Sequence, residues 1–253
     1  MKSKFAPGKK IPTKRVATRE KRRQQQRRQR MTVLLIIAGV AVVVVGLLAL
    51  GPIRNALSPV GDITDAAPRE HPNADGRAMG DPNAPVTVEV FEDFQCPACQ
   101  GFSLSIEPQV VEKYAPSGQI YYIYRFFPFL DDQSTSKESD RAAQASLCAA
   151  DQERFWDYHN LVFANWNGEN AGAFRDKRLQ AFAEKLGLDM TTFNQCFSDN
   201  PHQDIIDADI ARGRELGVTG TPTVFVNGQV VGDGRSVPNA DAIGLAIEAA
   251  LSQ

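Results

Sequence analysis

Residues 31–53 contain no charged side chain, and they include the apolar run 33–48. Because an α-helix rises 1.5 Å per residue, about 20 such residues cross the roughly 30 Å hydrocarbon core of a bilayer. We therefore predict one transmembrane helix over residues 31–53. A cleaved signal peptide is the alternative, since Ala49-Leu50-Gly51 resembles a cleavage site, but the apolar region of such a peptide usually has only about 7–15 residues.

The chain before this segment is strongly basic. Residues 1–30 hold 13 Lys and Arg but a single acid, Glu20, whereas the whole chain has a net charge of −2. Basic residues beside a transmembrane helix stay on the cytoplasmic side. We therefore predict a cytoplasmic tail over residues 1–30 and a single-pass protein of the cell membrane whose remainder is extracytoplasmic. Binding of nucleic acid or of anionic lipid is the alternative, but topology alone explains the charge, and we expect no nucleic-acid partner.

The remainder is long enough for one main globular domain. Of the 253 residues 43% are hydrophobic, which is sufficient to bury a core. Residues 54–80 contain several prolines and show no apolar periodicity, a pattern typical of a flexible linker. We predict that the globular domain spans residues 81–253.

The apolar pattern of this domain changes between strand and helix. A β-branched, alternating run at 86–91 predicts a strand, and similar runs recur near both ends of the domain. The predicted strands are 86–91, 119–126 and the hairpin 223–231, and the predicted helices are 101–114, 141–164, 175–186, 190–197, 202–216 and 238–251. This order predicts an α/β domain with a helical insert at about residues 137–216.

The motif Cys96-Pro97-Ala98-Cys99 follows the first strand and begins the first helix. A sulfur at a helix N-terminus meets unpaired N–H groups and the positive end of the helix dipole, which both favour a thiolate. We therefore predict a redox pair, with Cys96 as the nucleophile and Cys99 as the resolving cysteine. Glu92 and Asp93 would act against the thiolate if their carboxylates pointed toward it, and the sequence leaves that direction open.

Two other interpretations of this motif compete with the redox pair. The first is that the motif forms half of a zinc site. However, the other two cysteines form no second C-x-x-C, and the three histidines form no i, i+4 pair. We therefore predict no metal site. An inert structural disulfide is the other. A C-x-x-C placed between a strand and a helix is more often a redox pair.

Four segments resemble the DsbA-like thiol–disulfide oxidoreductases. They are Asp81-Pro82-Asn83-Ala84-Pro85-Val86, Asp93-Phe94-Gln95-Cys96-Pro97-Ala98-Cys99, Val218-Thr219-Gly220-Thr221-Pro222-Thr223 and Val226-Asn227-Gly228. The resemblance covers about residues 81–253. It implies a thioredoxin-like fold with an inserted helical domain, an exposed Cys96, and a cis Pro222 that faces the redox pair. Pro97, Ala98, Thr221 and Pro222 would support the active site, and the Thr221 backbone would bind an extended polypeptide. An ordinary strand-edge proline is the alternative for Pro222.

The chain departs from the family pattern at two places. Many members carry a buried glutamate six residues before the first cysteine, where this chain has Val90, and we assign Glu89 and Glu92 to a different strand phase. The residues between the cysteines are Pro97-Ala98, whereas well-known oxidants have Pro-His. These differences leave the reduction potential open, and with it the direction of electron flow.

Cys148 and Cys196 both lie in the predicted helical insert, 48 residues apart. A disulfide between them would restrict the unfolded chain and so stabilise the folded protein by about 4 kcal/mol. The oxidising environment outside the membrane permits such a bond. We predict this structural disulfide. Two free core thiols, or a second redox pair, are the alternatives.

From these features we predict an extracytoplasmic enzyme that introduces disulfides into exported proteins through Cys96 and Cys99, without a bound cofactor. The resemblance implies reoxidation by a membrane quinone-linked thiol oxidase of the DsbB or vitamin K epoxide reductase type. The bilayer itself would be a partner through the N-terminal helix. The alternatives are a disulfide reductase or isomerase and a redox-inactive binding module or chaperone.

Overall fold

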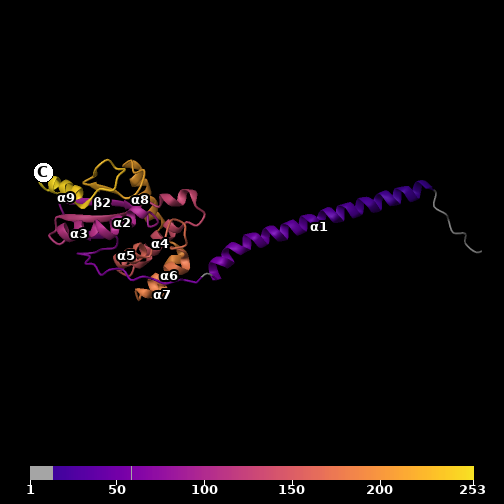
Figure 1. Ribbon diagram of the computed structural model, residues 1–253, viewed down its shortest axis with the longest axis horizontal. Coiled ribbons are helices and arrows are strands. Elements are labelled where there is room, and N and C mark those ends of the chain that lie inside the picture. The colour runs from indigo at the N-terminus through magenta and orange to yellow at the C-terminus, as the bar shows by residue number, and fades with distance from the viewer. Residues whose placement is uncertain (1–13, 58) are drawn as a thin grey trace, which may run out of the picture. The chain divides into compact units, whose positions relative to one another are not determined.

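The computed structural model describes residues 14–57 and 59–253, in two compact units that we treat separately (Figure 1). The first unit is one helix, α1 (Lys14–Leu57), which contains the predicted transmembrane segment 31–53. Within it, Gln25–Gly46 is long and apolar enough to cross a membrane. The first 13 residues of the predicted cytoplasmic tail, 1–30, lie outside the described residues.

The second unit is built on a five-stranded mixed sheet. Its strands lie in the order β1-β3-β2-β4-β5, and β2 pairs in parallel with β3 and antiparallel with β4. The bounds are β1 Ala78–Gly80, β2 Val86–Glu92, β3 Ile120–Phe126, β4 Thr223–Val226 and β5 Gln229–Val230. The central strand β2 is rich in valine and buried along nearly its whole length, as expected for a strand covered on both faces.

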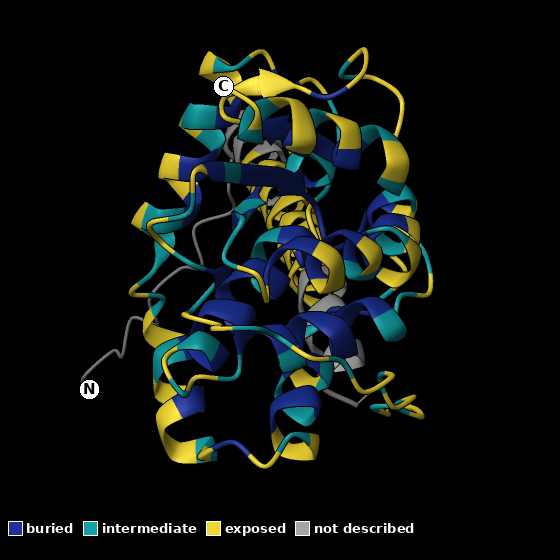
Figure 2. Cartoon of the chain, turned by 90° about the vertical axis from the view of Figure 1, so that its left-hand side faces the viewer, coloured by how far each residue is buried: buried dark blue, intermediate teal, exposed yellow. Residues whose placement is uncertain are grey.

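The two faces of the sheet are covered by different helices. One face carries Val88 and Val90 and belongs to the large core that includes residues of α2 (Pro97–Ser105), α3 (Glu107–Tyr114) and α9 (Ala240–Leu251). The opposite face carries Phe91 and lies against α8 (Gln203–Glu215), where the absence of a side chain at Gly213 leaves room for the Phe91 and Phe127 rings. Figure 2 shows buried residues along the sheet and on the helix faces turned toward it.

The remaining helices form a block beside the sheet, in which Phe155 and Trp156 contact Tyr124 on the first face. These helices are η1 (Phe129–Gln133), α4 (Glu138–Ala150), α5 (Phe155–Ala164), α6 (Asp176–Lys185) and α7 (Met190–Asp199). The α/β fold with a helical insert is thereby confirmed. The last helix of the predicted insert, α8, instead packs on the sheet, since its Asp209 accepts hydrogen bonds from the backbone N–H of Phe126 (3.0 Å) and from Arg125 (2.9 Å) in β3.

The segment before the sheet differs from the flexible linker predicted over 54–80. Residues 59–80 belong to the second unit and contact it along their length. The Thr64 N–H donates to Asn165 Oδ1 at 2.9 Å, Arg69 donates to the Ser103 carbonyl at 2.6 Å, and β1 adds an edge strand to the sheet. These contacts are polar or involve the backbone, so they leave no apolar periodicity in the sequence.

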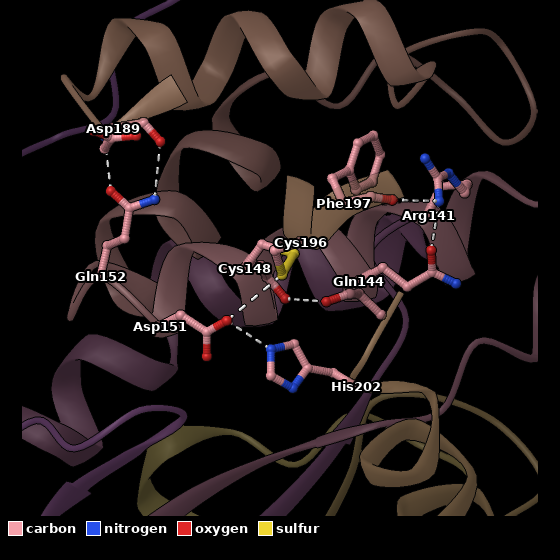
Figure 3. The surroundings of a disulfide bond; sticks show 11 residues. Arg141, Gln144, Cys148, Asp151, Gln152, Asp189, Cys196, Phe197 and His202 are labelled. Carbon is pink, nitrogen blue, oxygen red and sulfur yellow. Dashed lines mark hydrogen bonds and ion pairs between the residues drawn. A yellow bond between two sulfur atoms is a disulfide. The ribbon is translucent and has the colours of Figure 1, made fainter. Parts of the chain in front are cut away.

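Cys148 of α4 and Cys196 of α7 form a disulfide, with their Cα atoms 5.8 Å apart (Figure 3). Asp151 lies beside it, and one of its carboxylate oxygens is 2.8 Å from His202 Nε2 and 3.5 Å from Cys196 Sγ. The two cysteines are 48 residues apart in the sequence, so the bond joins α4 to α7.

Candidate active site

Cys96 is the N-cap of α2, immediately beyond the end of β2. Its backbone is extended (φ −73°, ψ 122°), and its N–H donates to the Asp93 carbonyl at 3.0 Å. Pro97 follows at the first helical position, where the missing N–H costs no helical hydrogen bond. The sequence thus turns sharply from strand to helix at Cys96 and places its sulfur at the helix N-terminus.

The loop before β4 approaches Cys96 from the neighbouring strand. Thr223 is the register partner of Phe91, so residues 221–222 lie at the end of β2 where the helix begins. The Thr221–Pro222 peptide bond is cis. The Cys96 thiol donates to the Thr221 carbonyl at 3.3 Å, which brings these distant parts of the sequence into direct contact.

The surroundings of Cys96 favour its thiolate. Its pKa is lowered from 9.0 to about 6, mainly because the Cys99 side chain hydrogen-bonds to the sulfur. Burial opposes this, and Thr221 and the backbone N–H groups of Cys99 and Ala98 lower the pKa further. The resemblance implied an exposed Cys96, but only 6% of the residue is accessible. The Cys96 residue is largely covered because the loop before β4 contacts its sulfur.

Cys99 has the opposite character. It lies one turn further into α2 and is fully buried. Burial raises its pKa well above 9.0, and the hydrogen bond to Cys96 and the charge of Glu92 raise it further. Both cysteines are free thiols in this structure. The pair therefore consists of a readily ionised outer thiol and an inner thiol that holds its proton.

The position of Glu92 differs from the one expected from the sequence. It lies two positions after Val90 and hence on the same face of β2, beneath α2 rather than in a different phase. It is 1% exposed, and burial raises its pKa well above 4.5, with the charges of Glu107 and Cys96 adding to the rise. Asp93 turns away and accepts hydrogen bonds from the N–H groups of Gln95 and Leu130 at 2.8 and 3.0 Å.

Two further ionisable side chains join Glu92 below Cys99. Glu107 of α3 and His159 of α5 are also buried, and the ligating atoms of the three residues all lie within 4.8 Å of one another. Burial raises the pKa of Glu107 to about 7 and lowers that of His159 to about 3. No local sequence pattern indicates this cluster, because its members lie 15 to 67 positions apart on a strand and two helices.

This cluster is one of two groups of side chains with metal-binding types of atom among the described residues. In the cluster, both glutamates would have to lose their protons before they could ligate a cation. The other group is Asp151, Cys196 and His202. Cys196 is held in its disulfide, which removes the thiolate that a metal would require.

The helical block also supports the turn that carries Cys96. The Trp166 indole N–H donates to the Gln95 carbonyl at 2.6 Å, and the Asn170 N–H donates to Gln95 Oε1 at 2.6 Å. Gln95 is fully buried and donates in turn to Ser139 Oγ at 2.9 Å. The residue before Cys96 is therefore held by α4 and by the loop that follows α5.

The strand β2 leads into a C-x-x-C motif at the start of α2, and a cis proline lies opposite this motif. This arrangement indicates the family to which the chain belongs. Residues 73–243 match the family model described as Thioredoxin. This chain belongs to the thioredoxin family. The DsbA-like form of the fold is also shown by a solved structure, BdbD from Bacillus subtilis in its oxidised state, with a TM-score of 0.61 over 75% of this chain and all of that one, at 22% identity. That likeness concerns the fold alone.

The curated relatives include proteins with different names. "Probable disulfide bond formation protein D" of Bacillus cereus is 26% identical over 219 residues, which make up 85% of this chain and 96% of that protein. "Na(+)/H(+) antiporter NhaA 3" of Salinispora tropica is 32% identical over 183 residues, or 71% of this chain. This chain spans only about a quarter (26%) of the antiporter's length.

Proposed function

We propose that this chain is a membrane-anchored thiol–disulfide oxidoreductase that introduces disulfides into exported proteins through Cys96 and Cys99. The observation that carries the proposal is the contrast within the pair. Cys96 has a pKa of about 6, while the pKa of the buried Cys99 is raised. A stabilised thiolate favours the reduced form, so the disulfide form readily takes electrons from substrate thiols.

The proposed reaction has two exchange steps. A substrate thiolate attacks Cys96 Sγ, the Cys96–Cys99 bond breaks, and Cys99 leaves as a thiolate that takes up a proton. A second substrate thiolate then attacks the substrate sulfur of the mixed disulfide, and Cys96 leaves. Two electrons pass from the substrate to the protein. Cys96 is a good leaving group because its thiolate is stable, and the backbone at Thr221 and the cis Pro222 would hold the extended substrate beside it.

Reoxidation and location are parts of the same proposal. A membrane quinone-linked thiol oxidase of the DsbB or vitamin K epoxide reductase type would reoxidise Cys96 and Cys99 and pass the two electrons to a membrane quinone. The basic residues before the apolar part of α1 favour a cytoplasmic N-terminus and an extracytoplasmic domain. Labelling of Cys96 in intact cells with a thiol reagent that cannot cross membranes tests the orientation, because only an outer domain would react.

Oxidation of a reduced, unfolded ribonuclease tests the activity. The oxidised protein should form disulfides in the ribonuclease and lose one disulfide per turnover, whereas Cys96→Ser should be inactive. Cys196→Ser combined with Cys148→Ser is the matched control, since it removes two cysteines but leaves the active pair. Equal activity of Cys96→Ser and wild type would support a binding module or chaperone instead.

The reduction potential decides between oxidase and reductase. A value near −120 mV is typical of an oxidant and a value near −270 mV of a reductant. We expect a value toward the oxidising end because the Cys96 thiolate is stabilised. A potential near that of a reductant would replace the oxidase proposal with the reductase or isomerase.

A further inference from the structure

Four side chains with metal-binding types of atom meet around the second pair of cysteines (Figure 3). Cys148 and Asp151 lie one turn apart at the end of α4, Cys196 lies in α7, and His202 is the N-cap of α8. An Asp151 oxygen, Cys196 Sγ and a His202 ring nitrogen all lie within 4.8 Å of one another. The Cys148 sulfur joins this group, because it is bonded to Cys196 Sγ.

The distances between these atoms are close to those of a tetrahedral zinc site. Zinc bonds of about 2.3 Å to sulfur and about 2.0–2.2 Å to nitrogen or oxygen place a sulfur and an oxygen ligand about 3.6 Å apart, and a nitrogen and an oxygen ligand about 3.4 Å apart. Asp151 Oδ2 lies 3.5 Å from Cys196 Sγ and 2.8 Å from His202 Nε2. Small movements of the Asp151 and His202 side chains would therefore admit an ion between the three atoms.

The two sulfurs can complete the ligand set only as thiolates. Two sulfurs bound to one zinc ion are about 3.8 Å apart, whereas in this structure they share a disulfide bond. Once that bond is absent, two thiolates, one imidazole and one carboxylate surround the same point. Thiolate and imidazole ligands favour zinc over magnesium or calcium.

The spacing of the four residues along the chain also suits such a site. Cys148 and Asp151 are three positions apart, and Cys196 and His202 are six positions apart. Structural zinc sites typically combine two pairs of ligands, each at short spacing. A search for a second C-x-x-C misses this arrangement, because the second member of each pair is an aspartate or a histidine.

An open cavity leads to the polar side of the group. Asp151 and His202 both line it, and their side chains are 43% and 21% exposed, whereas Cys148 is buried. Two arginines that line the same cavity, Arg77 and Arg125, are each paired with a carboxylate, so their charges are compensated. An ion from solvent can therefore reach the carboxylate and the imidazole directly.

We propose that Cys148, Asp151, Cys196 and His202 bind one zinc ion when the two cysteines are thiols. Every chain is synthesised with its cysteines as thiols, so this state precedes the disulfide. Zinc would then join the end of α4 to α7 and to the start of α8, where the disulfide later joins α4 to α7 alone. The cysteines of the C-x-x-C motif take no part, so this inference does not depend on the proposed function.

The interconversion of the two cross-links balances. A dithiol reductant gives two electrons and two protons to the Cys148–Cys196 disulfide and becomes a disulfide itself. Zn²⁺ then displaces the two thiol protons, which pass to water, and keeps its own charge. When a disulfide oxidant takes the two electrons, the Cys148–Cys196 bond forms again, the oxidant becomes two thiols with protons from water, and Zn²⁺ leaves unchanged.

Cobalt titration of the full-length chain tests the site. Co²⁺ can replace Zn²⁺ in a tetrahedral site, and it shows thiolate-to-metal charge-transfer absorption only where sulfur binds it. The parent protein for the titration carries Cys96→Ser and Cys99→Ser, which leaves Cys148 and Cys196 as the only cysteines. After reduction with a dithiol and removal of the reductant, we expect one Co²⁺ per chain with this absorption, and its displacement by one Zn²⁺ per chain.

The oxidised form of the same protein is the first control. It should show no charge-transfer absorption and bind Co²⁺ at least about 100-fold more weakly, because it has lost two of the four ligands. The oxidised form retains the buried cluster of Glu92, Glu107 and His159, whose atoms also lie within 4.8 Å of one another. Binding at that cluster would therefore be the same in both forms.

Three single variants of the reduced parent make the test specific. His202→Gln and Asp151→Asn should each weaken Co²⁺ binding at least about tenfold, since loss of even an outer partner of the ligands costs about 10–100-fold. Asp204→Asn removes one negative charge from an exposed side chain two positions after His202. It should bind Co²⁺ as tightly as the parent.

Urea unfolding gives a second readout that does not depend on absorption. Zinc should raise the unfolding midpoint of the reduced parent but not of the oxidised form, because a ligand that binds the folded state stabilises it. His202→Gln should lose most of this increase. If reduction loosens the helical block, zinc should restore its helical circular dichroism, and a failure to do so would count against the site.

Three results would overturn the zinc site. They are the absence of charge-transfer absorption in the reduced parent, equal Co²⁺ affinity in the reduced and oxidised forms, and undiminished affinity in both His202→Gln and Asp151→Asn. The last result would mean that the two thiols bind the ion without the residues beside them. All three leave the oxidoreductase proposal intact, because oxidation of ribonuclease tests Cys96 separately.

Discussion

Removal of the Cys99 side chain should raise the pKa of Cys96. The hydrogen bond from Cys99 is the largest contribution to the low pKa of about 6. A hydrogen bond to a charged group is worth about 1.5–3 kcal/mol, and each pKa unit corresponds to about 1.4 kcal/mol. We therefore expect Cys99→Ala to raise the pKa of Cys96 from about 6 to between about 7 and 8.

The matched variant is Cys99→Ser, which keeps a donor of similar size at the same position and should retain a pKa close to that of wild type. The assay is the rate of alkylation by iodoacetamide as a function of pH, with the labelled cysteine identified by mass spectrometry. At pH 7 a thiol with a pKa near 6 is about 90% ionised, whereas one near 9 is about 1% ionised. Wild type and Cys99→Ser should therefore react fast at neutral pH, and Cys99→Ala should react more slowly.

The same ionisation affects stability. The folded-state pKa of Cys96 lies below the ordinary value, so its thiolate stabilises the reduced protein above the unfolded pKa, and this contribution is lost as pH falls through about 6. The contribution of the Cys96 thiolate to stability is at most about 4 kcal/mol, because solvent screens its charge. A wild-type alkylation midpoint at 8.5 or above, or identical midpoints in Cys99→Ala and Cys99→Ser, would refute this account of the nucleophile.

Three stability predictions concern the scaffold, each measured by urea unfolding. Replacing both Cys148 and Cys196 by alanine should cost about 2–5 kcal/mol without moving the alkylation midpoint, and an unchanged stability would mean the bond is dispensable. Asp209→Ala should cost about 3–5 kcal/mol, because it removes a buried carboxylate that pairs with the partly buried Arg77 and Arg125, whereas the exposed Asp207→Ala should change stability little; equal effects would contradict the ion-pair explanation. Burial raises the pKa of Asp93 from 3.8 to about 7, so the folded state holds a proton that the unfolded state has lost, and stability should fall as pH rises across this window. Asp93→Asn should reduce that fall but not abolish it, because burial also raises the pKa of Glu107 to about 7; an unchanged fall would contradict the assignment to Asp93.

Local patterns predicted much of the fold and part of the candidate site. The alternation in 86–91 and the helix that follows Cys96 depend on neighbouring residues, so they can be recognised within a short window of sequence. The same is true of the apolar residues 31–53, which lie in α1, where Gln25–Gly46 is long and apolar enough to cross a membrane. The thioredoxin family and its DsbA-like fold followed from motifs in order along the chain.

The structure differs from the expectations at two places, because contacts between segments that are distant in the sequence determine it there. Residues 59–80 look like a linker because their prolines and polar residues show no periodicity, yet Thr64 and Arg69 find hydrogen-bond partners on the second unit. Likewise Cys96 was expected to be exposed, but a loop 125 residues further along the chain approaches its sulfur. No pattern within a short stretch of sequence indicates either contact.

Order along the chain was therefore enough to determine that a cysteine would begin a helix directly after a buried strand, and that a proline motif would precede a later strand. Only the folded chain decided how acidic that cysteine is and which buried groups surround its partner. Both properties depend on burial and on electrostatic forces between groups a few ångströms apart. Packing brings Glu92, Glu107 and His159 within that range, although they lie far from one another in the sequence.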